Sequence, residues 1–95
     1  MESPIKTARN KLCITQGDLA MLSGIPQARI SGYECAIVKL TEKAYRRIAD
    51  SMGIDVEILK INNESFIKIK RKEVEIRVQS IKDRIQLIKN QKDQS

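Results

Sequence analysis

Residues 15–34, TQGDLAMLSGIPQARISGYE, decide the fold of this 95-residue chain. Thr15 is a favoured N-cap, and Asp18 places an acidic side chain in a first helical turn, where the helix dipole favours it. Gly24 can take the left-handed conformation that ends a helix, and Pro26 suits the start of the next one. Two short helices joined by a turn containing glycine are the outline of a helix-turn-helix.

Apolar residues within this stretch fall at helical spacing. Leu19 and Ala20 give the first helix one apolar face, while Ile30 and Tyr33 lie three residues apart in the second. We therefore expect these four side chains in the core. The other faces of the second helix carry Gln27, Ala28, Arg29, Ser31 and Gly32.

The flanking sequence predicts three more helices, over residues 4–12, 42–52 and 56–60. The expected capping residues are Ser3, Thr41, Gly53 and Asp55. Asn62-Asn63 then interrupts the apolar pattern. We therefore predict an all-α domain of five helices over residues 1–61, with residues 62–95 as a separate C-terminal segment.

The C-terminal segment contains neither Gly nor Pro from Glu64 onward and has a heptad pattern. Its apolar residues occupy the a and d positions of a coiled coil. Arg71 and Lys92 also fall at a positions, so only the part from Val74 to Ile88 is continuous. We expect a coiled-coil-like helix whose oligomerisation residues are Ile67, Val74, Val78, Ile81, Ile85 and Ile88.

Two alternatives remain for this segment. Within residues 65–78, the runs FIKIK and EVEIRV alternate β-branched and charged residues, which is typical of strands and allows a hairpin. No turn glycine marks such a hairpin, so we favour the helix. A helix that packs back on its own domain is the second alternative.

The composition narrows the classes of partner. The chain has a formal net charge of +6. Residues 1–60 contribute +2 (nine Lys/Arg, seven Asp/Glu) and residues 61–95 contribute +4 (nine against five). This balance is compatible with a polyanionic partner. No apolar run of about 18 residues and no signal-peptide pattern is present, so we expect a soluble, cytoplasmic protein with no membrane partner.

The residues of common catalytic and metal sites are scarce. Cys13 and Cys35 are the only cysteines, and there is no histidine. Two cysteines alone cannot form a zinc site, and they lack C-x-x-C spacing. We expect reduced thiols, with a disulfide between them as the alternative. No constellation points to an enzyme, and no cofactor or metal is expected.

Four blocks together resemble a known family. They are Arg9, the TQ-x-x-LA of residues 15–20, the G-x-P-x-x-x-IS-x-x-E of residues 24–34, and IADSMGIDVEIL at residues 48–59. The segment resembles the XRE family, the helix-turn-helix domains of phage repressors, Cro proteins and many bacterial regulators. The resemblance implies a bacterial, phage or plasmid-encoded protein whose third helix enters the major groove of double-stranded DNA.

The resemblance also implies roles for individual residues. Gln27, Ala28 and Ser31 would sit against base edges, with Arg29 and Gly32 at the margin. Glutamine can pair with adenine through two hydrogen bonds, and an alanine methyl can meet the thymine methyl. Gln16 would bind a phosphate and brace the start of the recognition helix. Further phosphate contacts are implied for Lys39 and Lys43.

The segment shares one expected ion pair with the family and departs from the family at two places. The resemblance implies an internal ion pair between Arg9 and Glu34. Cys35 and Ala36 stand where the family has a basic residue and a glycine, so we expect the third helix to end differently here. Gly32 removes a side chain from the groove-facing surface, which predicts a sparse readout of bases.

The sequence thus predicts a DNA-binding transcriptional regulator, most simply a repressor that binds a two-fold symmetric operator as a homodimer. Its d positions are β-branched, whereas a parallel dimer favours leucine there. A tetramer is therefore a further expectation. The alternative function is an interaction protein of the antitoxin or antirepressor type, whose basic amphipathic tail binds a protein partner.

Overall fold

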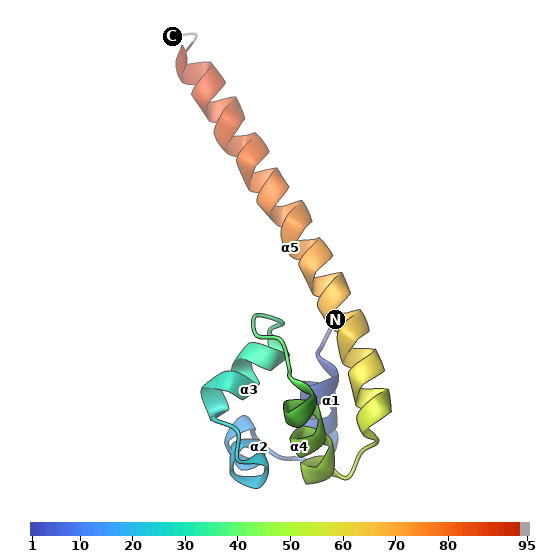
Figure 1. Cartoon of the computed structure of the whole chain (residues 1–95). Coiled ribbons are helices and arrows are strands. Elements are labelled where there is room, and N and C mark those ends of the chain that lie inside the picture. Colours follow the sequence, from blue (N-terminus) through green and yellow to red (C-terminus); the bar gives the residue numbers. More distant parts are fainter. Residues whose placement is uncertain (94–95) are drawn as a thin grey trace.

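A computed structural model describes residues 1–93 and contains no strand within them. The fold class is all-α, as predicted. Five helices follow one another along the chain (Figure 1): α1 Pro4–Lys11, α2 Gln16–Ser23, α3 Gln27–Glu34, α4 Glu42–Met52 and α5 Val56–Asp93.

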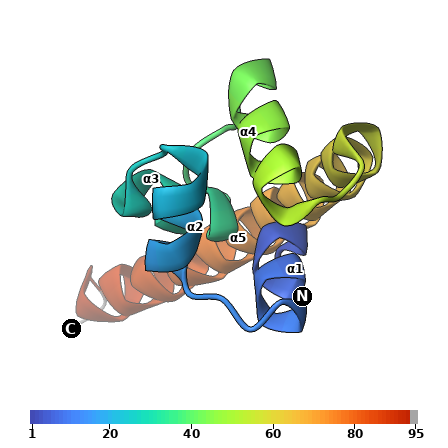
Figure 2. The same cartoon turned by 90° about the horizontal axis from the view of Figure 1, so that it is seen from below.

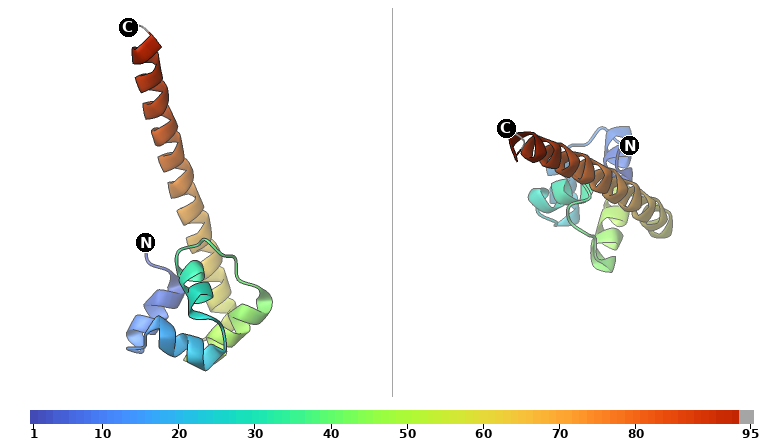
Figure 3. Two further views of the ribbon diagram at one scale, coloured as in Figure 1. Left: turned by 90° about the vertical axis from the view of Figure 1, so that its left-hand side faces the viewer. Right: turned by 90° about the horizontal axis from the view of Figure 1, so that it is seen from above.

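The molecule has a compact head and a long shaft. Helices α1 to α4 and the first turns of α5 form the head, in which α1 and α4 lie against α5, and the rest of α5 projects away from them (Figures 1 and 3). The principal extents are 62 × 24 × 22 Å. The first dimension is large because α5 alone has 38 residues, which at helical rise span about 57 Å.

The predicted caps are confirmed. Ser3 Oγ accepts a hydrogen bond from the amide of Lys6 at 3.0 Å. Thr15 and Asp18 form a reciprocal capping box, with distances of 3.0 and 2.9 Å. These side chains satisfy amides that a helix start leaves without partners. In the same way, Thr41 caps the start of α4 and Asp55 caps the start of α5.

The core lies where the head helices meet. Leu19 of α2 and Ile30 and Tyr33 of α3 are buried, as predicted from their spacing, and Ala20 is half-buried beside them. Helix α2 packs on both α3 and α4, and α1 packs on α5 (Figure 2). The remaining buried apolar side chains of this core are Ile5, Ile25, Leu40, Ala44, Tyr45, Ile48, Ala49, Met52 and Leu59.

The predicted interruption at Asn62-Asn63 is wrong, because α5 runs through both residues. Asn63 is fully buried, and its Nδ2 donates a hydrogen bond to the hydroxyl of Tyr45 at 3.1 Å. Asn62, the residue before it, is exposed. The short fifth helix and the tail are therefore one element, and the expected boundary between residues 61 and 62 lies inside it.

Further along α5, Phe66 and Ile67 are also buried against the head. Residues 65–78 are helical, which excludes the hairpin alternative. From Arg71 to Gln91 every side chain is exposed, so the shaft does not fold back on the head. No helix among the described residues combines the length and the apolar character that crossing a membrane requires.

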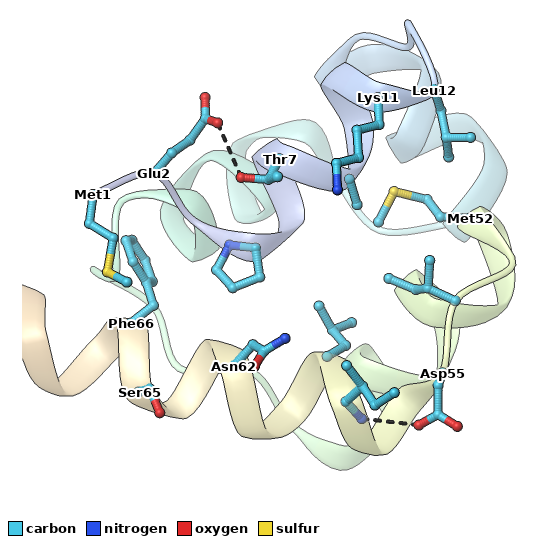
Figure 4. Close-up of a pocket in the computed structure, with 15 residues that line it drawn as sticks. Met1, Glu2, Thr7, Lys11, Leu12, Met52, Asp55, Asn62, Ser65 and Phe66 are labelled. Carbon is cyan, nitrogen blue, oxygen red and sulfur yellow. Dashed lines mark hydrogen bonds between the residues drawn. The ribbon is translucent and has the colours of Figure 1, made fainter.

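Two features lie where α5 meets the neighbouring helices. The Lys60 ammonium donates a hydrogen bond to the Glu42 carboxylate of α4, which lowers the pKa of Glu42 and raises that of Lys60. A mainly apolar hollow also lies between α1, the end of α4 and the start of α5, with the side chains of Met1 and Phe66 together at one end (Figure 4).

Candidate nucleic-acid interface

Helix α3 has one buried face and one exposed face. Ile30, Tyr33 and Glu34 are buried, which fixes the helix against the head. Gln27, Ala28 and Arg29 are exposed over its first turn, whereas Ser31 and Gly32 are half-buried. The three exposed residues therefore form a short strip on a helix that the core holds in place.

The start of α2 lies beside the start of α3. Gln16 and Gln27 are the first residues of these two helices. The Oε1 atom of Gln27 is 3.5 Å from the point where a Cβ on Gly17 would lie. The Gln27 side chain therefore lies beside the start of α2, at ordinary contact distance from Gly17.

Gln16 has a different structural partner from the one that the resemblance implies. Its Nε2 donates a hydrogen bond to Glu34 Oε1 at 3.2 Å. Glu34 is the last residue of α3, so Gln16 braces the end of α3 and not its start. The side chain is half-buried, which leaves part of its amide accessible.

Arg9 and Glu34 form a buried two-bond ion pair at the positions that the resemblance pairs. Arg9 Nε and one terminal nitrogen donate to the two Glu34 oxygens, each at 2.8 Å. The other terminal nitrogen donates to the Ile14 carbonyl at 2.9 Å. The Glu34 carboxylate raises the pKa of Arg9. This cluster joins α1, the loop before α2, and the end of α3.

Helix α3 ends in the geometry usually made by glycine, although we expected a different ending. Ala36 takes the left-handed conformation with φ of 59°. The amide of Ile37 donates to the Gly32 carbonyl at 2.9 Å, and the amide of Ala36 to the Tyr33 carbonyl at 3.2 Å. These two bonds define a Schellman motif. Alanine is therefore held in a strained conformation by the bonds around it.

Gly32 faces the loop that follows α3. A Cβ built on Gly32 would lie 2.6 Å from Val38 Cγ2, which is too close for two carbon atoms. The glycine lets Val38 pack on the backbone of α3. We expected Gly32 to leave a gap in a groove-facing surface, but the space beside it is occupied by Val38.

Four cations surround a shallow hollow between α3 and α4. They are Arg29 of α3, Lys39 of the loop, and Lys43 and Arg47 of α4. All four are exposed, and none contacts a carboxylate within residues 1–91, whose side chains the structure describes. Arg47 was not predicted as a site residue. Its signal in the sequence was its position four residues after Lys43, on the same face of a helix.

The two cysteines are separate thiols. Both Cys13 and Cys35 are free and exposed, so no disulfide joins them. Among the described residues, no group of three metal-ligating side chains is close enough to hold an ion.

A family model described as helix-turn-helix matches residues 5–59, which is more than half of the chain. The chain therefore belongs to the XRE-like helix-turn-helix family of DNA-binding regulators. No curated protein and no solved structure matches it. The matched segment contains α1 to α4 and the start of α5, together with the exposed strip and the four cations.

Proposed function

We propose that this protein is a sequence-specific transcriptional repressor that inserts α3 into the major groove of DNA. The exposed strip of Gln27, Ala28 and Arg29 carries the proposal, because a buried face and the Arg9–Glu34 pair hold its helix in place. A rigid helix is a better base reader than a loop, because it holds its side chains in a fixed geometry.

The strip has side chains suited to base edges. The Gln27 amide can form two hydrogen bonds with adenine, the Ala28 methyl can contact a thymine methyl, and Arg29 can bind guanine through two donors. Ser31 is half-buried and would reach a base only at the edge of the strip. Gly32 offers its backbone at most, because Val38 covers it.

Phosphate contacts would surround the strip. Gln16 lies at the start of α2, while Lys39, Lys43 and Arg47 lie on the other side of α3. The charges of these three cations are not neutralised within the described part of the protein, so a phosphate would not have to displace an ion pair. Such contacts position the protein on DNA, and base contacts supply the sequence preference.

Binding to an operator would require two copies of the chain. An eight-residue α3 reaches few bases, and pairing two half-sites is the usual route to useful affinity. We assign the pairing to the α5 seam, which we define as Val74, Val78, Ile81, Ile85 and Ile88. These side chains are between 41% and 59% exposed in the single chain, so a second helix can bury them.

Two details of the pairing concern Ile67 and the heptad. Ile67 was expected in the seam, but it is buried against its own head and we leave it out. The β-branched residues at d positions permit a tetramer built from two dimers. Residues 68–91 would then form the oligomerisation part of the chain. A repressor of this kind would act in the cytoplasm of a bacterial cell, where its operator is accessible.

Selection of bound sites from random DNA tests the proposal. We expect enrichment of a two-fold symmetric site whose half-sites lie about one helical turn, roughly 10 base pairs, apart. Lys39→Gln removes one proposed phosphate contact and no base contact, so this control variant should bind more weakly and enrich the same sequence. Failure to enrich any sequence from the wild-type protein would contradict sequence-specific binding.

A further inference from the structure

The α5 seam is bordered by basic residues on both sides. In the heptad that places Val78 and Ile85 at a, the g positions hold Lys70, Arg77 and Arg84. The e positions hold Glu75, Lys82 and Lys89. These positions flank the apolar seam and meet the flanks of whatever helix packs on it.

The positive charge of this part of α5 is largely uncompensated. Residues 67–90 contain eight Lys/Arg and three Asp/Glu. Within residues 1–91, Lys70 is the only one of these cations in contact with a carboxylate, that of Glu73 at 3.4 Å. Asp83 instead accepts a hydrogen bond from Gln79 at 2.9 Å. The flanks therefore present charge that a partner can neutralise.

A second copy of the chain does not neutralise it. In a parallel pair each g residue faces the e residue five positions further along the other helix. Each of the contacts Arg77–Lys82 and Arg84–Lys89 would then occur twice and would repel, whereas Lys70 would face Glu75. In an antiparallel pair g residues face each other, and all three are cations. Either arrangement sets like charges along most of the seam.

We propose that the α5 seam is a docking site for an acidic amphipathic helix of a different protein, which competes with a second copy for the seam. Such a helix would place apolar residues at a and d, and Asp or Glu at e and g. Its carboxylates would face Arg77, Lys82, Arg84 and Lys89. Displacing the second copy would also release the DNA. This consequence rests on the function proposed above.

The size of the preference follows from the number of reversed pairs. One exposed pair of charges on neighbouring helical positions changes an equilibrium by about 1.5- to 2-fold in either direction. A parallel second copy makes four like-charge and two opposite-charge contacts along the seam, whereas the acidic helix makes one and five. The acidic helix should therefore be favoured by about tenfold to sixtyfold at low salt. The apolar contacts are shared by both complexes and do not discriminate.

Two synthetic helical peptides probe this surface on the full-length protein. Both have identical isoleucine and leucine residues at a and d, but one has Glu and the other Lys at every e and g position. Fluorescence anisotropy of the labelled peptides should show binding of the Glu peptide at least about tenfold tighter, with an affinity that falls as salt rises. Equal binding, tighter binding of the Lys peptide, or no binding of either would overturn the proposal.

A matched pair of variants locates the interaction. Arg84→Glu changes the charge beside the seam, and Lys72→Glu makes the same change at a b position away from it. We expect Arg84→Glu to weaken the Glu peptide several-fold and Lys72→Glu to change it by less than about twofold. Equal losses would mean general attraction to a basic helix, which contradicts docking at the seam.

Sedimentation of the protein with the Glu peptide tests the competition. The expected product is a complex of one chain with one peptide, at the expense of the self-associated form. Peptide bound to an intact dimer would overturn the competition. These readouts need no DNA, so failure to find a preferred operator would contradict the proposed function and leave peptide docking to be judged on its own result.

Discussion

At the scale of single residues, Glu34 and Arg9 each make three side-chain hydrogen bonds in the head. The Glu34 carboxylate accepts two hydrogen bonds from Arg9 and one from Gln16. Both charged side chains of the pair are less than a tenth exposed. The pair therefore depends on its partners for the solvation that water would otherwise supply.

Replacing Glu34 by Gln should lower the free energy of unfolding by about 3–5 kcal/mol, because it leaves the buried Arg9 charge without a counterion. Urea denaturation measures the change. Glu64→Gln, at an exposed position in the interior of α5, is the matched control and should be close to neutral. Equal effects of the two variants would show that the ion pair does not hold α1 to α3.

The helix ends with positive φ show how far a single residue type predicts the local backbone conformation. Gly24 and Gly53 were predicted as helix ends, and both have positive φ. Cys13 and Ala36 adopt the same conformation, with φ of 57° and 59°, but neither residue type signals it. Their conformation comes from the hydrogen bonds of the surrounding turns, which the sequence does not display.

Ala36→Gly should raise the free energy of unfolding by about 0.5–1 kcal/mol, since glycine has no Cβ to oppose the left-handed conformation. Thermal unfolding gives the sign directly. Ala28→Gly makes the same replacement inside α3 and should instead lower the stability by about 1 kcal/mol. Destabilisation by both variants would show that Ala36 is not strained.

At the scale of elements, α5 is where the sequence misled us most. The asparagine pair at residues 62 and 63 suggested a break, because asparagine favours caps and turns over helix interiors. In the structure Asn63 is part of the core and bonds to Tyr45, so packing outweighs its local preference. By contrast, α1 to α4 and their caps were predictable, because apolar spacing and capping residues agree there.

Asn63→Ala should lower the free energy of unfolding by about 1–3 kcal/mol, because it leaves the buried Tyr45 hydroxyl without its partner. Asn62→Ala, at the exposed preceding residue, which makes no side-chain hydrogen bond with the described residues, should be nearly neutral or slightly stabilising. Comparison of their denaturant midpoints measures the contrast. Similar midpoints would mean that the Asn63–Tyr45 bond contributes nothing to stability.

The candidate site was also only partly predictable from the sequence. Exposure of Gln27, Ala28 and Arg29 follows from the positions of Ile30 and Tyr33 on α3. The contact between Gly32 and Val38 depends on the path of the loop, which no spacing rule fixes. The grouping of Arg47 with Arg29 depends on how α4 packs, and it became visible only in the folded chain.

At the scale of the whole molecule, charge and apolar surface are combined on one long helix. In the proposed pairing, the α5 seam would favour association, while its basic flanks would oppose association of like chains. Because salt screens exposed charges, the two effects can be separated. The DNA-binding head should respond to salt in the opposite direction, because phosphate contacts release counterions.

Self-association should therefore tighten as salt rises from about 0.05 M to about 0.5 M, whereas DNA binding should weaken over the same range. Sedimentation equilibrium measures the first effect and anisotropy on a short duplex the second. In Val78→Asp, self-association should be lost at every salt concentration. Weaker self-association at high salt would contradict the proposed repulsion between α5 flanks.

The most direct test of α3 as the base-reading helix compares Gln27→Ala with wild-type protein on a selected site and on unrelated DNA. The preference for the selected site should fall by about 5- to 150-fold, the equivalent of about 1–3 kcal/mol, while binding to unrelated DNA stays within about twofold. Gln79→Ala, on the exposed shaft, should leave both unchanged. If Gln27→Ala weakened binding to both DNAs equally, Gln27 would be a positioning residue and α3 would not read bases as proposed.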